Sequence, residues 1–450
     1  MAALVKDPSD QPGVLSFPNI RMFLAFRVLF NARFYYPIFT ILFLDFGLTL
    51  EQFAILNAAW AATIILAEVP SGALADRWGR RKLVRIAGVL MVIEMALLCL
   101  TPGGVSPWLF WIFLLNRILS GAAEAAASGA DEALAYDSLA QNGREGEWPK
   151  VLEALMKLQS IGFFLAMVIG AAVYDPNLID TVAGWLGYSQ EWSQEDTLHF
   201  PLYLNFLTAI GALWAALRMS EDLSIIETSS SSLGTPWRKT IRTGLWILRT
   251  PIPFVLILGG IFFDSVARLF VTLTSEYFRI IEIPEVYFGI IGACVALLGL
   301  VLPRVARAMV ENLSLGTNTL LLTLWIALSL FGLSLVIPYW GILFAVTTMT
   351  AMRFTDFFLS HYLNREVDSR HRATVLSFRG LAMNLGYGGL SLLYGFLIEK
   401  LKTGGADGDK AFQEALGYFA PWFLVTILLL VVVARLRGVW RIETRGEPSR

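Results

Sequence analysis

The sequence contains twelve apolar runs that are each long enough to cross a lipid bilayer. A helix needs about 20 apolar residues to span the hydrocarbon core of a membrane. The runs lie near residues 22–44, 53–71, 84–101, 108–128, 151–173, 200–218, 252–275, 286–308, 314–336, 341–361, 374–397 and 415–436. We therefore predict an all-α membrane protein with twelve transmembrane helices.

The amino-acid composition supports this class. Of the 450 residues, 56% are hydrophobic and 16% are charged, whereas a soluble domain carries about 25% charged residues. A net charge of −1 gives no general attraction to nucleic acid. Cys99 and Cys294 lie in separate apolar runs, so no disulfide framework is expected.

A basic motif, residues 72–85, separates the second run from the third and reads GALADRWGRRKLVR. Lys and Arg are concentrated in the cytoplasmic loops of membrane proteins. With the N-terminus placed inside, 25 of the 35 Lys and Arg residues fall in inner segments and 4 fall in outer loops. This distribution predicts that both termini are cytoplasmic, which requires an even number of spans.

The longest inner loop divides the predicted spans six and six. Its serine run and Gly-Thr-Pro sequence indicate a flexible linker. We therefore predict an N-terminal six-helix bundle at 1–218, a cytoplasmic linker at 219–249 and a C-terminal six-helix bundle at 250–450. A weak internal repeat agrees with two halves, since Arg117 in the fourth run corresponds to Arg353 in the tenth.

The basic motif has a defined pattern, Gly72-x-x-x-Asp76-Arg77-x-Gly79-Arg80-Arg81. This pattern resembles, at every defining position, the signature that the major facilitator superfamily carries between its second and third spans. The span count and the six-plus-six division extend the resemblance to the whole chain. The segments 68–71, 128–139 and 372–381 look like a prokaryotic branch of uncertain substrate. The resemblance implies two pseudo-symmetric bundles that transport a solute by alternating access.

The resemblance also implies a gating role for the basic motif, which in the family links the two halves and helps to close the cytoplasmic gate. Gly72 would let the second span approach another helix closely. Asp76 would meet the N-terminus of the eleventh span, and Arg80 would pair with Asp131 or Asp137. The full predicted gating set is Gly72, Asp76, Arg77, Gly79, Arg80, Arg81, Asp131 and Asp137. The alternative is that the basic residues only fix the topology.

Eight of the ionisable side chains inside predicted spans are candidates for a functional role. A charge at the bilayer centre costs about 2.5–3.5 kcal/mol even on lenient scales, so each needs a partner, a water-filled cavity or a task. They are Arg33, Glu94, Arg117, Glu124, Asp264, Arg268, Arg353 and Asp356. In the superfamily the first, fourth, seventh and tenth spans line the central cavity, and all of these residues except Glu94 belong to those spans.

Seven of these residues, all except Glu94, form our predicted path for substrate and protons. Arg33 and Arg117 have no acidic residue within one turn of their own helix, so either is suited to contact an anionic substrate group or to compensate a carboxylate that takes up a proton. Glu124, Asp264 and Asp356 are candidates for proton uptake. Alternatively, the pairs Asp264–Arg268 and Arg353–Asp356 are self-satisfied ion pairs, because their spacing places each pair on one helix face.

We predict a secondary transporter of a small polar or anionic solute that is coupled to protons, lies in the inner cell membrane and needs only one chain. The first alternative is a proton-antiporting exporter of lipophilic compounds. Such exporters usually have a Gly-Pro motif in the fifth span, which here has Gly162 and Gly170 but no proline before Pro176. A receptor scaffold and a membrane enzyme are further alternatives. No cofactor is expected, because the chain has no P-loop and its three histidines lack a metal-site spacing.

Overall fold

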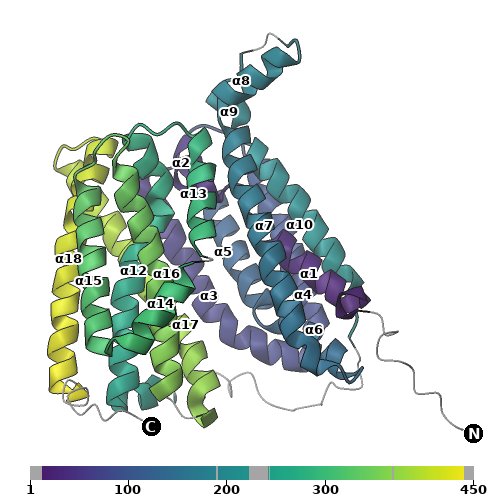
Figure 1. Ribbon diagram of the computed structural model, residues 1–450. Coiled ribbons are helices and arrows are strands. Elements are labelled where there is room, and N and C mark those ends of the chain that lie inside the picture. The colour runs from purple at the N-terminus through teal and green to yellow at the C-terminus, as the bar shows by residue number, and fades with distance from the viewer. Residues whose placement is uncertain are drawn as a thin grey trace, which may run out of the picture.

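The computed structural model describes residues 13–188, 191–221, 242, 244–299, 301–366 and 369–439, and within these ranges all regular structure is helical (Figure 1). The elements of the first part of the chain are η2 (Val14–Ser16), α1 (Pro18–Asn31), η3 (Tyr36–Ile38), α2 (Phe39–Asp45), α3 (Leu50–Trp78), α4 (Arg80–Cys99), α5 (Leu109–Ala127), α6 (Ala130–Ala140), η4 (Glu145–Glu147), α7 (Trp148–Tyr174), α8 (Pro176–Trp185), α9 (Gln194–Thr197) and α10 (Phe200–Arg218). Those of the second part are α12 (Pro251–Ile280), α13 (Val286–Leu298), α14 (Leu302–Asn312), α15 (Leu315–Ser334), α16 (Gly341–Glu366), α17 (Ser369–Thr403) and α18 (Gly408–Leu436).

Nine helical segments in the described part of the chain are long and apolar enough to cross a membrane. A tenth crossing is obtained if α13 and α14, whose axes differ by 41°, are counted as one broken span. The helices at the predicted first and third spans are not both long and apolar enough to meet these criteria. The first is divided between α1 and α2, and α4 carries the charges of the basic motif together with Glu94. The count of twelve spans and the direction of the chain across the membrane stay predictions.

The predicted continuous first span is interrupted. α1 ends at Asn31, and the chain continues through an irregular segment and the short helix η3 before α2 begins. Pro37 lies at this break, and proline cannot donate a hydrogen bond within a helix. Phe34 N–H in the irregular segment donates instead to Asn205 Oδ1 of α10 at 2.5 Å. Irregular backbone within a membrane is tolerated where protein groups satisfy it in this way.

The two ends of the helix bundle differ. We call the end that carries residues 77–85 the basic end and the opposite end the distal end. At the distal end, α3 packs against α17, α7 against α13, and α2 against α12. Toward the basic end, the lower parts of α3 and α17 diverge (Figure 1). The helices α1–α10, the N-terminal group, therefore meet α12–α18, the C-terminal group, mainly at the distal half of the molecule.

The structure describes little of the predicted linker but most of the distal loop between α7 and α10. Most of the predicted linker 219–249 lies outside the described residues. At the distal end, α8 and α9 project away from the bundle (Figure 1). Trp185 at the end of α8 and Tyr188 after it are 81% and 70% exposed, and exposed aromatics of this kind suit the membrane–water interface.

The contact of α3 with α17 depends on a glycine. An added Cβ at Gly388 would lie 3.1 Å from the Ala61 side chain, whereas at Gly389 it would meet nothing within 4 Å. We expect Gly388→Val to lower the free energy of unfolding by about 1–3 kcal/mol, because the extra methyl groups overpack this contact. Thermal and denaturant unfolding of the purified protein measure the effect. Gly389→Val is the matched control, and equal losses in both variants would contradict the assigned contact.

Candidate functional site

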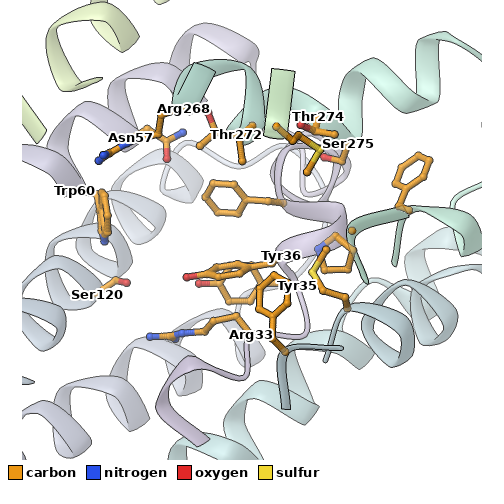
Figure 2. Close-up of a pocket in the computed structure, with 18 of the residues that line it drawn as sticks. Arg33, Tyr35, Tyr36, Asn57, Trp60, Ser120, Arg268, Thr272, Thr274 and Ser275 are labelled. Carbon is orange, nitrogen blue, oxygen red and sulfur yellow. The ribbon is translucent and has the colours of Figure 1, made fainter. Parts of the chain in front are cut away.

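A cavity of about 280 Å³ lies between the N-terminal and C-terminal groups. We call it the central cavity. Its walls come from the break after α1 and from α3, α5, α7, α12, α13, α16 and α17. Figure 2 shows Arg33 and Tyr36 on one side of this cavity, with Arg268, Thr272 and Ser275 along the opposite side. Four of the seven predicted path residues line it: Arg33, Arg117, Glu124 and Arg268.

Arg33 follows the end of α1 and is 4% exposed. Its Nη1 donates to Glu94 Oε1 of α4 at 2.6 Å, and Glu94 is fully buried. The backbone carbonyl of Glu94 in turn accepts from Asn116 Nδ2 of α5 at 2.9 Å. Arg33 is therefore a neutralised part of the cavity wall, and its pairing with Glu94 ties the break after α1 to α4.

Arg117 of α5 has no carboxylate partner among the described residues. The side chain is 6% exposed, and its Nη2 donates to Asn57 Oδ1 of α3 at 3.3 Å. The guanidinium also lies 5.3 Å from the ring centre of Phe39 and 5.2 Å from that of Trp60. Cation–π contacts stabilise such a group by about 0.5–2 kcal/mol without cancelling its charge. Arg117 therefore brings an uncompensated positive charge to the central cavity.

Arg268 of α12 presents a third guanidinium from the C-terminal group. Its Nη2 pairs with Asp264 Oδ2 at 2.8 Å, one turn earlier on the same helix. Its Nη1 donates to Asn384 Oδ1 of α17 at 3.0 Å, and the guanidinium lies 5.7 Å from the ring centre of Tyr387. The predicted sharing of one helix face by Asp264 and Arg268 is present, and only Arg268 reaches the central cavity.

The remaining lining of the central cavity mixes one carboxyl, hydroxyl groups and aromatic rings. Glu124 of α5 lines the cavity and forms no ion pair among the described residues. Hydroxyl groups come from Ser120, Thr272 and Ser275, and the rings from Tyr35, Tyr36, Phe39, Trp60, Phe163, Phe278, Phe288 and Tyr387. Positively and negatively charged groups thus lie among aromatic rings in this cavity. Sites for small organic ligands are usually built in this way.

Arg353 and Asp356 lie away from the central cavity. They line a second cavity of about 450 Å³ between α14, α16 and α17. The alternative ion pair between the two is not formed, because Asp356 Oδ1 accepts from Arg379 Nη2 of α17 at 2.8 Å. The i, i+3 spacing places Asp356 near Arg353, but the carboxylate pairs with an arginine of the neighbouring helix α17 instead.

The basic end contains a network of ion pairs within the N-terminal group. Arg80 of α4 pairs with Asp137 of α6. Asp131, the other carboxylate considered for Arg80, instead pairs with Arg27 Nε of α1 at 2.6 Å. Gly79 adopts φ +94° where α3 turns into α4, a conformation that favours glycine.

Gly72 does not have the close helix contact predicted for it. Gly72 is exposed, and an added Cβ there would meet nothing within 4 Å. The reason is that α3 and α17 diverge toward this end (Figure 1). The side chains of Asp76, Arg372 and Ala373, which carry the predicted contact with the eleventh span, lie outside the described residues.

The distal end is closed by contacts that cross between the two groups. Thr40 N–H of α2 donates to Ser275 Oγ of α12 at 2.9 Å, and the Thr40 hydroxyl donates to the carbonyl of Thr272. Further out, Arg279 donates to both oxygens of Asp45 at 2.7 and 2.8 Å. Arg279 also donates to Glu285 Oε1 at 2.6 Å. We call Asp45, Arg279 and Glu285 the distal ion-pair cluster.

The prediction from sequence missed several of these residues. Asn57 and Trp60, the contacts of Arg117, carry no charge and are indistinguishable in sequence from packing residues. Asp45 and Arg279 lie at the ends of apolar runs, where charged residues are common. Within the described residues, no group of three or more His, Cys, Asp or Glu is arranged to hold a metal ion.

The chain matches the profile of the Major Facilitator Superfamily over residues 21–391. It therefore belongs to this family of membrane transporters, and is a multi-pass secondary transporter and not an enzyme. No curated protein matches the chain by sequence.

Solved structures with the same fold include three transporters. The nucleoside transporter NupG is 12% identical with a TM-score of 0.68, covering 92% of this chain and 98% of that chain. A bacterial homologue of the human lysosomal transporter Spinster, in an inward-facing and unoccupied conformation, is 15% identical with a TM-score of 0.69, covering 98% and 100%. A D-xylose–proton symporter is 14% identical with a TM-score of 0.64, covering 91% and 96%. At these identities the likeness establishes the fold.

The Arg33–Glu94 pair provides a test of the site. Glu94→Met leaves a buried guanidinium without its counter-charge, so we expect a loss of about 3–5 kcal/mol in the free energy of unfolding. The double variant Arg33→Met/Glu94→Met removes both charges and is expected to recover most of this loss. Denaturant unfolding of the three proteins measures both effects. A double variant as unstable as the single variant would show that the pair is not the cause.

Proposed function

We propose that the chain carries a small polar or anionic solute across the membrane by alternating access. The observation that carries this proposal is Arg117. A buried guanidinium without a carboxylate partner is costly in a membrane protein, and a charge at this depth normally has a functional reason. An anionic group of the solute, lying in the central cavity, supplies the missing counter-charge.

The opposite walls of the cavity suit a solute that is held by both groups of helices. Arg117 comes from the N-terminal group, while Arg268, Thr272 and Ser275 come from the C-terminal group. A solute that bridges them is released when the groups rock apart. We assign these groups to the two predicted six-helix units, 1–218 and 250–450, in a twelve-span chain with both termini in the cytoplasm.

In this orientation the structure is an inward-facing state. The distal end, which carries the distal ion-pair cluster, is extracellular, and the basic end is cytoplasmic. We propose that Asp76, Arg77, Arg80 and Arg81 act when the cytoplasmic side closes and Gly72 meets the opposite group. The predicted close approach of Gly72 then belongs to the outward-facing state.

We propose that transport is coupled to protons and that Glu124 takes up the proton. Glu124 is the carboxyl of the cavity lining, and it faces the solute site without an ion-pair partner among the described residues. Asp264 is already paired with Arg268 and does not line the central cavity. Arg353, Asp356 and their cavity are placed on the route between the central cavity and the cytoplasm. One chain in the inner cell membrane, surrounded by lipid, contains the whole path.

Export of lipophilic compounds is the alternative function. The aromatic frame of the central cavity favours it, because flat lipophilic cations pack well on aromatic faces. The uncompensated positive charge of Arg117 in the same lining opposes a cationic substrate. The two functions therefore differ in the charge of the solute they accept.

Transport by proteoliposomes tests the proposal. The measurement is proton movement across liposomes that contain the purified protein, over a panel of anionic, zwitterionic and lipophilic cationic solutes. We expect an anion to move protons, and Arg117→Met to lower kcat/KM for it by about tenfold to a hundredfold. This range corresponds to the loss of hydrogen bonds to a charged group, about 1.5–3 kcal/mol.

Arg307→Met is the matched control, because Arg307 is an exposed side chain of α14 that pairs with Glu311. It should transport like the unmodified protein. Proton movement driven only by lipophilic cations, and insensitive to Arg117→Met, would favour the exporter and refute the anionic solute.

A further inference from the structure

Glu276 is a buried carboxyl near the distal end of α12 that the proposed transport path does not use. The residue is 5% exposed, and its Oε2 has no hydrogen-bond partner. No ion pair or hydrogen bond involves its carboxyl within the described residues. An unpaired ionised carboxylate at this depth costs several kcal/mol, so a group of this kind needs either a partner or a proton.

Two neighbouring carboxyls of the distal end, those of Asp45 and Glu285, have partners. Asp45 accepts two hydrogen bonds from Arg279 and one from the Tyr174 hydroxyl. Glu285 accepts from the same guanidinium. Burial raises the pKa of Glu285 even though Arg279 opposes this effect. Glu276 is more deeply buried than Glu285 and lacks its ion pair, so no cation within the described residues compensates a negative charge on it.

The charges that face Glu276 are unbalanced. The groups within electrostatic reach of its carboxyl are Arg279 on α12, Asp45 on α2, Glu285 before α13, Asp409 on α18 and Tyr394 on α17. Arg279 is the cation of this set, and it is already engaged by Asp45 and Glu285. A further negative charge at Glu276 would therefore add repulsion without gaining a counter-ion.

We propose that Glu276 binds a proton that holds the distal end closed. Asp45 belongs to the N-terminal group, and Arg279 and Glu276 belong to the C-terminal group. When the distal end opens, Asp45 leaves Arg279, which keeps Glu285 but loses one of its two carboxylate partners. Its guanidinium lies about one turn from Glu276 on the same helix face. Glu276 then pairs with Arg279 and releases its proton to the water that enters. Closing reverses the exchange, so one proton is taken up for each closure.

This proton is distinct from the one assigned to Glu124. The α12 residues that line the central cavity near this level are Thr274, Ser275 and Phe278, so Glu276 lies on another side of the helix. Its proton therefore exchanges with the medium at the distal end and not with the solute site. Acid in that medium favours the closed distal end, whether or not a solute is bound.

A distance measurement without solute tests the proposal. Spin labels are placed on Val105→Cys, in the loop after α4, and Trp340→Cys, before α16, in a background of Cys99→Ser and Cys294→Ser. Val105 and Trp340 are 91% and 68% exposed at the distal ends of the two groups. Label distances are measured from about pH 5.5 to 8.5. We expect the ratio of closed to open molecules to rise as the pH falls, by at most about tenfold per pH unit for one linked proton.

Glu276→Gln imitates the protonated carboxyl and should keep the distal end closed at every pH. Glu276→Met should do the same, which guards against an effect peculiar to the amide. Glu282→Gln, an exposed change two residues beyond the end of α12, should retain the pH response. A pH response that survives Glu276→Gln, or that disappears only in Glu285→Gln, would overturn the proposal. Because no solute is present, failure here leaves the transport proposal standing, and the reverse also holds.

Discussion

The cost of placing arginine inside a membrane is the constraint on which the site depends. The three guanidinium groups of the central cavity are compensated by different partners and to different degrees. Arg33 has a buried carboxylate on α4, and Arg268 has one on its own helix together with an amide on α17. Arg117 has one weak hydrogen bond and two aromatic rings. The two compensated arginines stabilise the walls, and the uncompensated one is where we propose that a negative charge is bound.

The break after α1 brings these groups together. A continuous helix from residue 22 to 44, at about 100° per residue, would place Tyr35 about 200° around the axis from Arg33 and so on the opposite face. The irregular backbone instead lets Arg33, Tyr35 and Tyr36 line the same cavity. Asn205 of α10 satisfies the exposed amide of Phe34, so the break is supported by a neighbouring helix.

The sequence predicted the fold class and the family because apolar run length and the basic motif are local signals. It also identified Arg33, Arg117, Glu124 and Arg268, since a charge in an apolar run is visible without any structure. The partners were not predictable. Glu94 reaches Arg33 from α4, and Arg379 reaches Asp356 from α17, so both pairs depend on how the helices pack against one another. Glu276 was overlooked because the predicted seventh span ended at residue 275, one residue too early.

The ion pairs of the two ends join different partners. At the distal end, Arg279 and Asp45 connect the two groups of helices. The pairs Arg80–Asp137 and Arg27–Asp131 lie inside the N-terminal group and need not break when the groups separate. In the alternating access that we propose, opening the distal end therefore breaks ion pairs, whereas the pairs described at the basic end persist. Dissolved salt weakens partly exposed ion pairs by screening, so the ionic strength of the medium at the distal face shifts the balance between states. The ionic strength of the medium at the basic face does not shift this balance through the pairs Arg80–Asp137 and Arg27–Asp131, because both lie within one group.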